Sequence, residues 1–196
     1  MAHWQDTPGH AWLYLSSDEL ARMPEIARRP SYEEDVEWAI AVLALPELAE
    51  NKKLFGGGKE ATLKLAREHC CNYYPDIYEQ LTGKKATPKN SWKRAEDKFY
   101  RDHTNDWIVI APYGDWKEGV PKGFVLGEAT LGGKRKHAAL RSFLIPKKRY
   151  DKRGPFGYFI RTKNTLWSRL YLNWQKIIGY VQGPPVDKEV KQANTR

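Results

Sequence analysis

The sequence predicts an α+β fold: N-terminal helices packed on an antiparallel β-meander of three to five strands, closed by a C-terminal amphipathic helix. Three observations predict it. Residues 107–111 are an uninterrupted apolar run rich in β-branched side chains, typical of a buried strand. Two more strand-like runs, 124–130 and 138–145, lie on either side of Gly132 and Gly133, a pair suited to a tight hairpin. Apolar residues at helical spacing occur before and after this region.

Length and composition are those of a folded, soluble protein. The chain has 196 residues, of which 41% are hydrophobic, so it can bury a core without disulfide bonds. It has no apolar run of membrane-spanning length and no secretory leader pattern. Cys70 and Cys71 are adjacent, and neighbouring cysteines bridge only with strain, which fits a reducing compartment. We therefore expect a cytoplasmic protein that does not contact membranes.

We expect one α+β domain over residues 1–183, with a helical layer in 16–103, the sheet in 107–161 and a closing helix in 165–181. Residues 184–196 have the composition of a polar tail. The helix over 165–181 has a wide apolar face, which we expect to pack on the sheet. The alternative for this face is a partner helix or a second subunit, which would give a homodimer.

The N-terminal half contains several helix signals. Residues 9–15 alternate partially, which suits an edge strand of the later sheet. Ser16 with Glu19, and Ser31 with Glu34, have the capping-box spacing that begins helices. The second box predicts a helix over residues 32–45 with an acidic first turn. Further helices are expected over 59–73, over 75–81 with Gly83 as the terminating residue, and over 91–103.

Positive charge is concentrated in the second half of the chain. Residues 1–100 hold 14 Lys and Arg against 16 Asp and Glu, whereas residues 101–196 hold 19 against 8. The densest stretch follows the double glycine, and its cations are Lys134, Arg135, Lys136, Arg141, Lys147, Lys148, Arg149, Lys152 and Arg153. Such asymmetry favours a polyanionic partner, with nucleic acid first among the candidates.

If this stretch lies on the hairpin and the loop after it, its cations project from one end of the sheet. They would then contact phosphates, and the nearby aromatics Tyr150, Phe156, Tyr158 and Phe159 could stack on unpaired bases. No helix has a basic recognition face, so contacts would be mainly to the backbone. The alternative is a solvated face of an ordinary basic protein.

A second group of residues suggests catalysis. Glu34, Asp35, His103 and Asp115, with Glu33, Glu37 and Asp106 nearby in sequence, could hold Mg²⁺ or Mn²⁺ or act as acid and base on a phosphodiester. Acids at a helix start also complement the helix dipole, however, which is a sufficient structural reason for them. We therefore assign no catalytic residues, metal or cofactor in the first interpretation. Gly114-Asp115-Trp116 is interpreted as a structural turn.

Several motifs support a comparison with known proteins. They are GH at 9–10, YEEDVEWAI at 32–40, PDIYEQLTG at 75–83, FYRDHTNDWIVIAPYGDW at 99–116, VPKGFVLGEATLGGKR at 120–135 and FLIPKKRY at 143–150. Together they resemble an uncharacterised family of small proteobacterial proteins associated with plasmids and phages. The resemblance covers roughly residues 7–155 and implies a mobile-element context in the bacterial cytoplasm, without a known activity.

The leading interpretation is therefore a non-enzymatic accessory protein of a mobile element. It would bind nucleic acid or a host nucleoprotein complex through the basic stretch, and an anti-defence inhibitor would fit that context. One alternative is a metal-dependent phosphodiesterase that uses the acidic cluster. The other is a protein–protein interaction module that uses the aromatic surface and the last helix.

Overall fold

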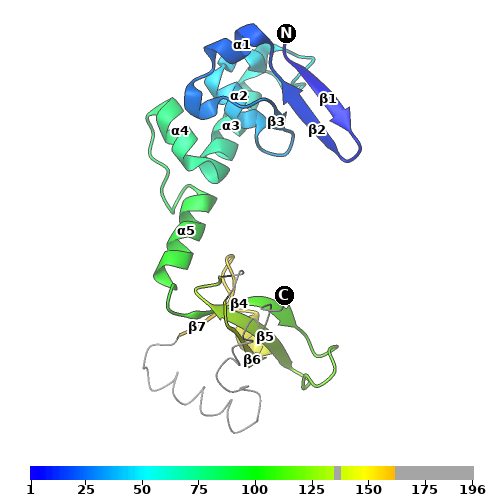
Figure 1. The fold of residues 1–196 in the computed structure, drawn as a ribbon, viewed down its shortest axis with the longest axis vertical. Helices are drawn as coiled ribbons and strands as arrows, with labels where there is room; N and C mark the ends of the chain where they lie inside the picture. Colours follow the sequence, from blue (N-terminus) through cyan, green and yellow to red (C-terminus); the bar gives the residue numbers. More distant parts are fainter. Residues whose placement is uncertain (135–137, 162–196) are drawn as a thin grey trace, which may run out of the picture. The chain divides into compact units, whose positions relative to one another are not determined.

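The computed structural model describes residues 1–134 and 138–161. It divides the chain into two compact units, Met1–Lys98 and Phe99–Arg196 (Figure 1), and each is described here by itself. Helices and antiparallel sheets are both present, so the α+β class is confirmed. The expected closing helix over 165–181 and the tail over 184–196 lie outside the described residues. The packing of the helical layer on the meander stays a prediction.

The first unit combines a small sheet with short helices. Its strands are β1 (His3–Thr7), β2 (His10–Tyr14) and β3 (Tyr32–Glu33), paired antiparallel in the order β1-β2-β3. Its helical elements are α1 (Ser17–Arg22), η1 (Glu25–Ala27), α2 (Trp38–Ala44), η2 (Pro46–Glu50), α3 (Lys59–Tyr73) and α4 (Pro75–Thr82). They share one core, in which Leu13, Tyr32 and Ile40 have no exposed surface.

The expected partner of residues 9–15 is wrong. These residues form β2, which is the central strand of the first unit's own sheet and not an edge strand of the later one. Alternation buries Leu13 in the helical core, as the pattern suggested. Its neighbour β1 has the polar sequence HWQDT, which carries no strand signal. The pairing of β1 with β2 could therefore not be predicted from the sequence of β1.

The expected helix over residues 32–45 begins later, at Trp38. Tyr32 is fully buried in β3, where its hydroxyl donates to the Ala27 carbonyl (2.8 Å). Burial, the largest effect, raises the pKa of this phenol. Glu33 pairs with Trp12 of β2, and a turn follows. The burial of Tyr32 and the pairing of Glu33 thus outweigh the capping-box spacing of Ser31 and Glu34. Ser31 and Glu34 do not cap a helix.

The other helices follow the sequence signals. Ser16 and Glu19 form the expected capping box at α1. Helix α3 has the predicted bounds, and Gly83 ends α4 in the left-handed conformation with φ of 68°. Helix α5 (Trp92–Asp102) crosses from the first unit to the second, within the predicted range of 91–103.

The second unit contains the predicted meander. Strands β4 (Trp107–Tyr113), β5 (Phe124–Leu131) and β6 (Leu140–Pro146) pair in sequence, and β7 (Phe159–Ile160) pairs with the start of β4. Strand β4 continues through Pro112, beyond the predicted end at 111. On the β7 side, Trp107 and Ile108 pair with β7 and the Val109 N–H donates to the Tyr158 carbonyl (2.9 Å). No strand among residues 1–134 and 138–161 pairs with the later part of β4 on that side, where a proline is tolerated.

Aromatic side chains pack on the meander. One cluster contains the buried Ala129, Phe143 and Ile145 with Trp107, Tyr150 and Tyr158 around them. Elsewhere, the ring of Phe99 on α5 lies 5.8 Å from that of Phe156 and 6.1 Å from that of Phe159. Tyr150, Phe156, Tyr158 and Phe159 are therefore half-buried packing residues. Their expected role in stacking on bases stays a prediction.

The capping box of α1 gives the first testable prediction. The Ser16 N–H donates to Glu19 (2.8 Å), and the Glu19 N–H donates to the Ser16 hydroxyl (3.3 Å). Burial would raise the pKa of Glu19, but hydrogen bonds from Ser16 and Ala2 hold that pKa below its usual value. Ser16→Ala should lower the free energy of unfolding of the first unit by ~1 kcal/mol, measured by urea denaturation. Ser17→Ala, one residue inside the helix, is the control; equal effects of the two substitutions would refute the cap.

Gly127 tests the packing of the sheet. A Cβ at this position of β5 would lie 2.8 Å from Ile145 Cδ1 and 2.9 Å from Val109 Cγ2, on the strands to either side. Gly127→Ala should therefore destabilise the second unit by ~1–3 kcal/mol through overpacking, measured as a shift of its unfolding transition. Gly154→Ala, where a Cβ would meet no atom within 4 Å, should have little effect. A neutral Gly127→Ala variant would contradict the register described here.

Candidate functional site

Lys134 and the five cations from Lys147 to Arg153 lie at opposite ends of strand β6. Lys134 follows the hairpin turn, beside the pair Thr130 and Leu140, whereas the cations from Lys147 onward follow the pair Phe124 and Pro146. The seven residues of β6 separate the two groups, a strand length of ~20 Å. The expectation that all of them project from one end is therefore wrong. Arg135 and Lys136 lie outside the described residues.

Five of the cations form a compact group, which we call the basic segment: Lys147, Lys148, Arg149, Lys152 and Arg153. It consists of the short helix α6 (Lys147–Tyr150) and the turn after it. Lys147 pairs with Asp151 (2.9 Å), and the Arg153 guanidinium lies 4.5 Å from the centre of the Tyr150 ring. Lys148, Arg149 and Lys152 are exposed and form no ion pair with any described carboxylate. The segment therefore presents unneutralised positive charge.

Arg141 is placed differently. It is half-buried on β6, opposite Ala129, with its guanidinium 4.7 Å from the centre of the Trp107 ring. This cation–π contact stabilises the sheet by ~0.5–2 kcal/mol. We assign Arg141 to packing and not to the exposed basic surface.

An exposed aromatic residue, Trp116, lies in the loop between β4 and β5. Its side chain is 77% exposed, although its indole Nε1 packs against Gly114 so closely that a Cβ there would be 2.8 Å away. The Tyr113 ring meets it edge-on (6.2 Å), and Lys117 Nζ lies 3.4 Å from the centre of the Tyr113 ring. The indole is thus held in place while its surface stays open to solvent.

The loop between β4 and β5, residues 114–123, is called the Trp116 loop. It lies at the same end of the meander as the basic segment. The loop ends at Gly123, whose carbonyl accepts a hydrogen bond from the Lys147 N–H (2.9 Å). The sequence assigned Gly-Asp-Trp to a structural turn, and Gly114 does fill that role. The exposure of Trp116 was missed, because the sequence carries no signal that tells whether an aromatic residue in a turn packs or stays exposed.

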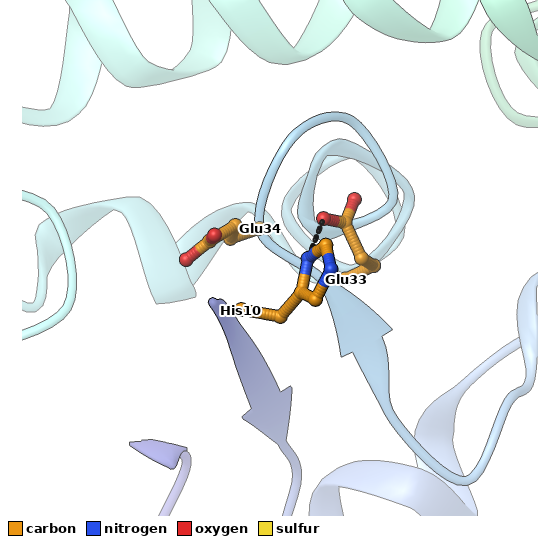
Figure 2. Close-up of side chains that lie close together, drawn as sticks. All are labelled: His10, Glu33 and Glu34. Carbon is orange, nitrogen blue, oxygen red and sulfur yellow. Dashed lines mark ion pairs between the residues drawn. The ribbon is translucent and has the colours of Figure 1, made fainter. Parts of the chain in front are cut away.

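In the first unit, His10, Glu33 and Glu34 come together at the start of β2 and the end of β3 (Figure 2). One ligand atom from each side chain lies within 4.8 Å of the others, and His10 Nδ1 is 3.7 Å from Glu33 Oε1. The His10 side chain is 61% exposed and that of Glu33 is 19% exposed. Among the described residues, this is the one group of three potential metal ligands.

The remaining members of the predicted acidic cluster are placed elsewhere or otherwise engaged. Glu37 forms an ion pair with Arg29 and accepts a hydrogen bond from the Glu33 N–H (3.3 Å). Asp35 is exposed. His103 and Asp115 belong to the second unit, where His103 Nδ1 lies 2.8 Å from Asp106 Oδ2 and Asp115 is exposed in the Trp116 loop. The phosphodiesterase interpretation stays a prediction.

Cys70 and Cys71 pack inside the first unit. Burial, the largest effect, raises the pKa of the Cys70 thiol to about 12 and also raises that of Cys71. The Cys71 Sγ lies 3.2 Å from the Asn90 carbonyl, to which the thiol donates. Both thiols therefore stay protonated near neutral pH and react slowly, which agrees with a packing role.

A sequence comparison identifies the family. The model of the Domain of unknown function (DUF7007) matches residues 2–104, more than half of the chain. The protein belongs to this family. The match covers the first unit and all of α5, and it ends before β4.

Two other comparisons give no match: none with a curated protein and none with a solved structure. Within the described residues, none of the helices has the length and apolar character needed to cross a membrane.

Proposed function

We propose that this protein binds nucleic acid through the basic segment and the Trp116 loop. One observation carries the proposal: Lys148, Arg149 and Lys152 are exposed within a few residues of each other and have no carboxylate partner among the described residues. Unpaired cations held close together repel one another. A polyanion would relieve that repulsion.

The chemistry of the segment favours phosphate over base recognition. Lysine and arginine side chains on a short helix and turn can each approach a phosphate, and every contact releases condensed counterions from the nucleic acid. Helix α6 has four residues, too few to enter a groove as a recognition helix. The proposed binding is therefore sensitive to salt and only weakly dependent on sequence.

Trp116 adds a preference for unpaired bases. Trp116 is exposed in the loop at the same end of the meander as the basic segment, and an exposed aromatic ring combined with cations is the arrangement by which proteins stack on single strands, worth ~1–3 kcal/mol per base. In a duplex the base faces are already stacked on one another, so this energy is gained only with a single strand. We infer that single-stranded nucleic acid is the preferred form.

The biological setting rests on the motif resemblance to plasmid- and phage-associated proteins. An accessory role on a mobile element is consistent with a small basic protein that reads backbone charge. Within that setting, interference with a host nucleoprotein complex, including a defence complex, is the role we propose.

A charge-reversal variant tests the proposal. Lys148→Glu, Arg149→Glu and Lys152→Glu together should weaken binding of a fluorescent single-stranded oligonucleotide, measured by anisotropy at several salt concentrations. Loss of three phosphate contacts should make the negative slope of log affinity against log salt concentration less steep by ~2. The control reverses three exposed lysines of the first unit: Lys52, Lys53 and Lys64. If the control variant lost as much affinity as the variant of the basic segment, only net charge would matter. Unchanged binding by the variant of the basic segment would refute the proposed site.

Trp116→Ala separates stacking from charge. It should weaken single-strand binding by roughly ten-fold, in keeping with one stacked base, while duplex binding and the salt slope stay unchanged. Equal losses for single and double strands would contradict stacking on unpaired bases.

A further inference from the structure

His10, Glu33 and Glu34 combine one imidazole with two carboxylates at a single point on the surface of the first unit (Figure 2). This grouping differs from an acidic patch, because it offers a nitrogen and an oxygen donor type together. A neutral imidazole with two carboxylates also carries a charge of −2, which a divalent cation would neutralise. Imidazole and carboxylate are the ligands preferred by zinc, manganese and related first-row metals.

The backbone holds the three residues next to one another. His10 begins β2 and Glu33 ends β3, and these strands pair antiparallel through Trp12 and Glu33. One step further, the Glu34 N–H donates to the Ala11 carbonyl (3.1 Å). Strand pairing therefore carries Glu34 to the residue adjoining His10, so the cluster is a consequence of the sheet register.

Glu33 is oriented by its surroundings. Its Oε2 accepts a hydrogen bond from the Asp35 N–H (2.8 Å), and its own N–H donates to Glu37, which is in turn paired with Arg29. Oε1 is left on the side of His10. A carboxylate with one oxygen held by the backbone and the other free to coordinate is the usual arrangement around a metal ligand.

We infer that His10, Glu33 and Glu34 form a binding site for a divalent first-row transition metal, with Zn²⁺ as the best fit. Two ligands of a tetrahedral zinc ion, each at ~2.0–2.1 Å, are ~3.3 Å apart. His10 Nδ1 and Glu33 Oε1 stand at 3.7 Å, close to that spacing and beyond hydrogen-bond length. Ligand atoms of the cluster that are up to 4.8 Å apart would have to move closer together to bind the same ion. Three protein ligands leave the fourth zinc position to water or another small ligand.

The competing explanation is a simple ion pair between His10 and Glu33. It requires a protonated imidazole and gives Glu34 no role. The two explanations differ in their need for Glu34, which distinguishes them experimentally.

The test is isothermal titration calorimetry of the untagged protein with zinc chloride, with Co²⁺ absorption as a second readout of coordination. The wild type should bind one Zn²⁺. His10→Ala and Glu34→Gln should each weaken Zn²⁺ binding by at least ~10-fold, because loss of a residue that only hydrogen-bonds to a metal ligand already costs about that much affinity. His3→Ala and Asp35→Asn are matched controls: His3 is an exposed imidazole at the other end of the β1–β2 ladder, Asp35 is an exposed carboxylate next to Glu34, and neither belongs to the cluster. They should bind as the wild type does. Far-UV circular dichroism checks that each variant is folded.

Absence of Zn²⁺ binding to the wild type would refute the site and leave the ion pair as the explanation. Binding that survives His10→Ala or Glu34→Gln would place the metal elsewhere and would equally refute it. The test does not involve the basic segment, so its outcome is independent of nucleic-acid binding.

Discussion

The antiparallel register between β5 and β6 is the constraint on which the placement of charge depends. It runs from Phe124 opposite Pro146 to Thr130 opposite Leu140 without interruption. Because β6 is fully paired, the cations before and after it are kept a strand length apart. The register also brings Lys147 to the carbonyl of Gly123, so the basic segment begins beside the end of the Trp116 loop. A one-residue slip would take Phe143 and Ile145 out of the cluster that they form with Ala129 and Ile160, so this packing fixes the register.

The sequence was sufficient wherever a local pattern decides the structure. Helix α3 and the strands of the meander could be predicted because their apolar spacing and flanking glycines are local signals. Strand β1 could not, since HWQDT has no apolar alternation and becomes a strand only by pairing with β2. The segment after Ser31 has a helix-start pattern, but burial of Tyr32 and pairing of Glu33 with Trp12 require an extended chain.

The candidate sites show the same division. The excess of positive charge is a property of composition and was visible directly. Its separation into two groups depends on the position of a strand between them, and the exposure of Trp116 depends on how a loop folds back on Gly114. The His10 cluster was missed because His10 is distant in sequence from Glu33 and Glu34 and meets them only through the pairing of β2 with β3. Glu33 and Glu34 were assigned to a helix start, where their negative charges would have complemented the helix dipole.

The two sites belong to different units and differ in their relation to the family. The His10 cluster lies within residues 2–104, which match the Domain of unknown function (DUF7007), whereas the Trp116 loop and the basic segment lie beyond that match. In our account a metal site is therefore a candidate property of the family domain. Nucleic-acid binding is a candidate property of what this chain adds after it.

The central claim is that one end of the meander, and not positive charge in general, contacts the nucleic acid. Acetylation footprinting of lysines by mass spectrometry, with and without a single-stranded oligonucleotide, tests it most directly. The account predicts protection of Lys148 and Lys152, while Lys134 at the opposite end of β6 and Lys52 in the first unit stay as reactive as in the free protein. Equal protection of Lys134 and Lys148, or no protection of either, would contradict it.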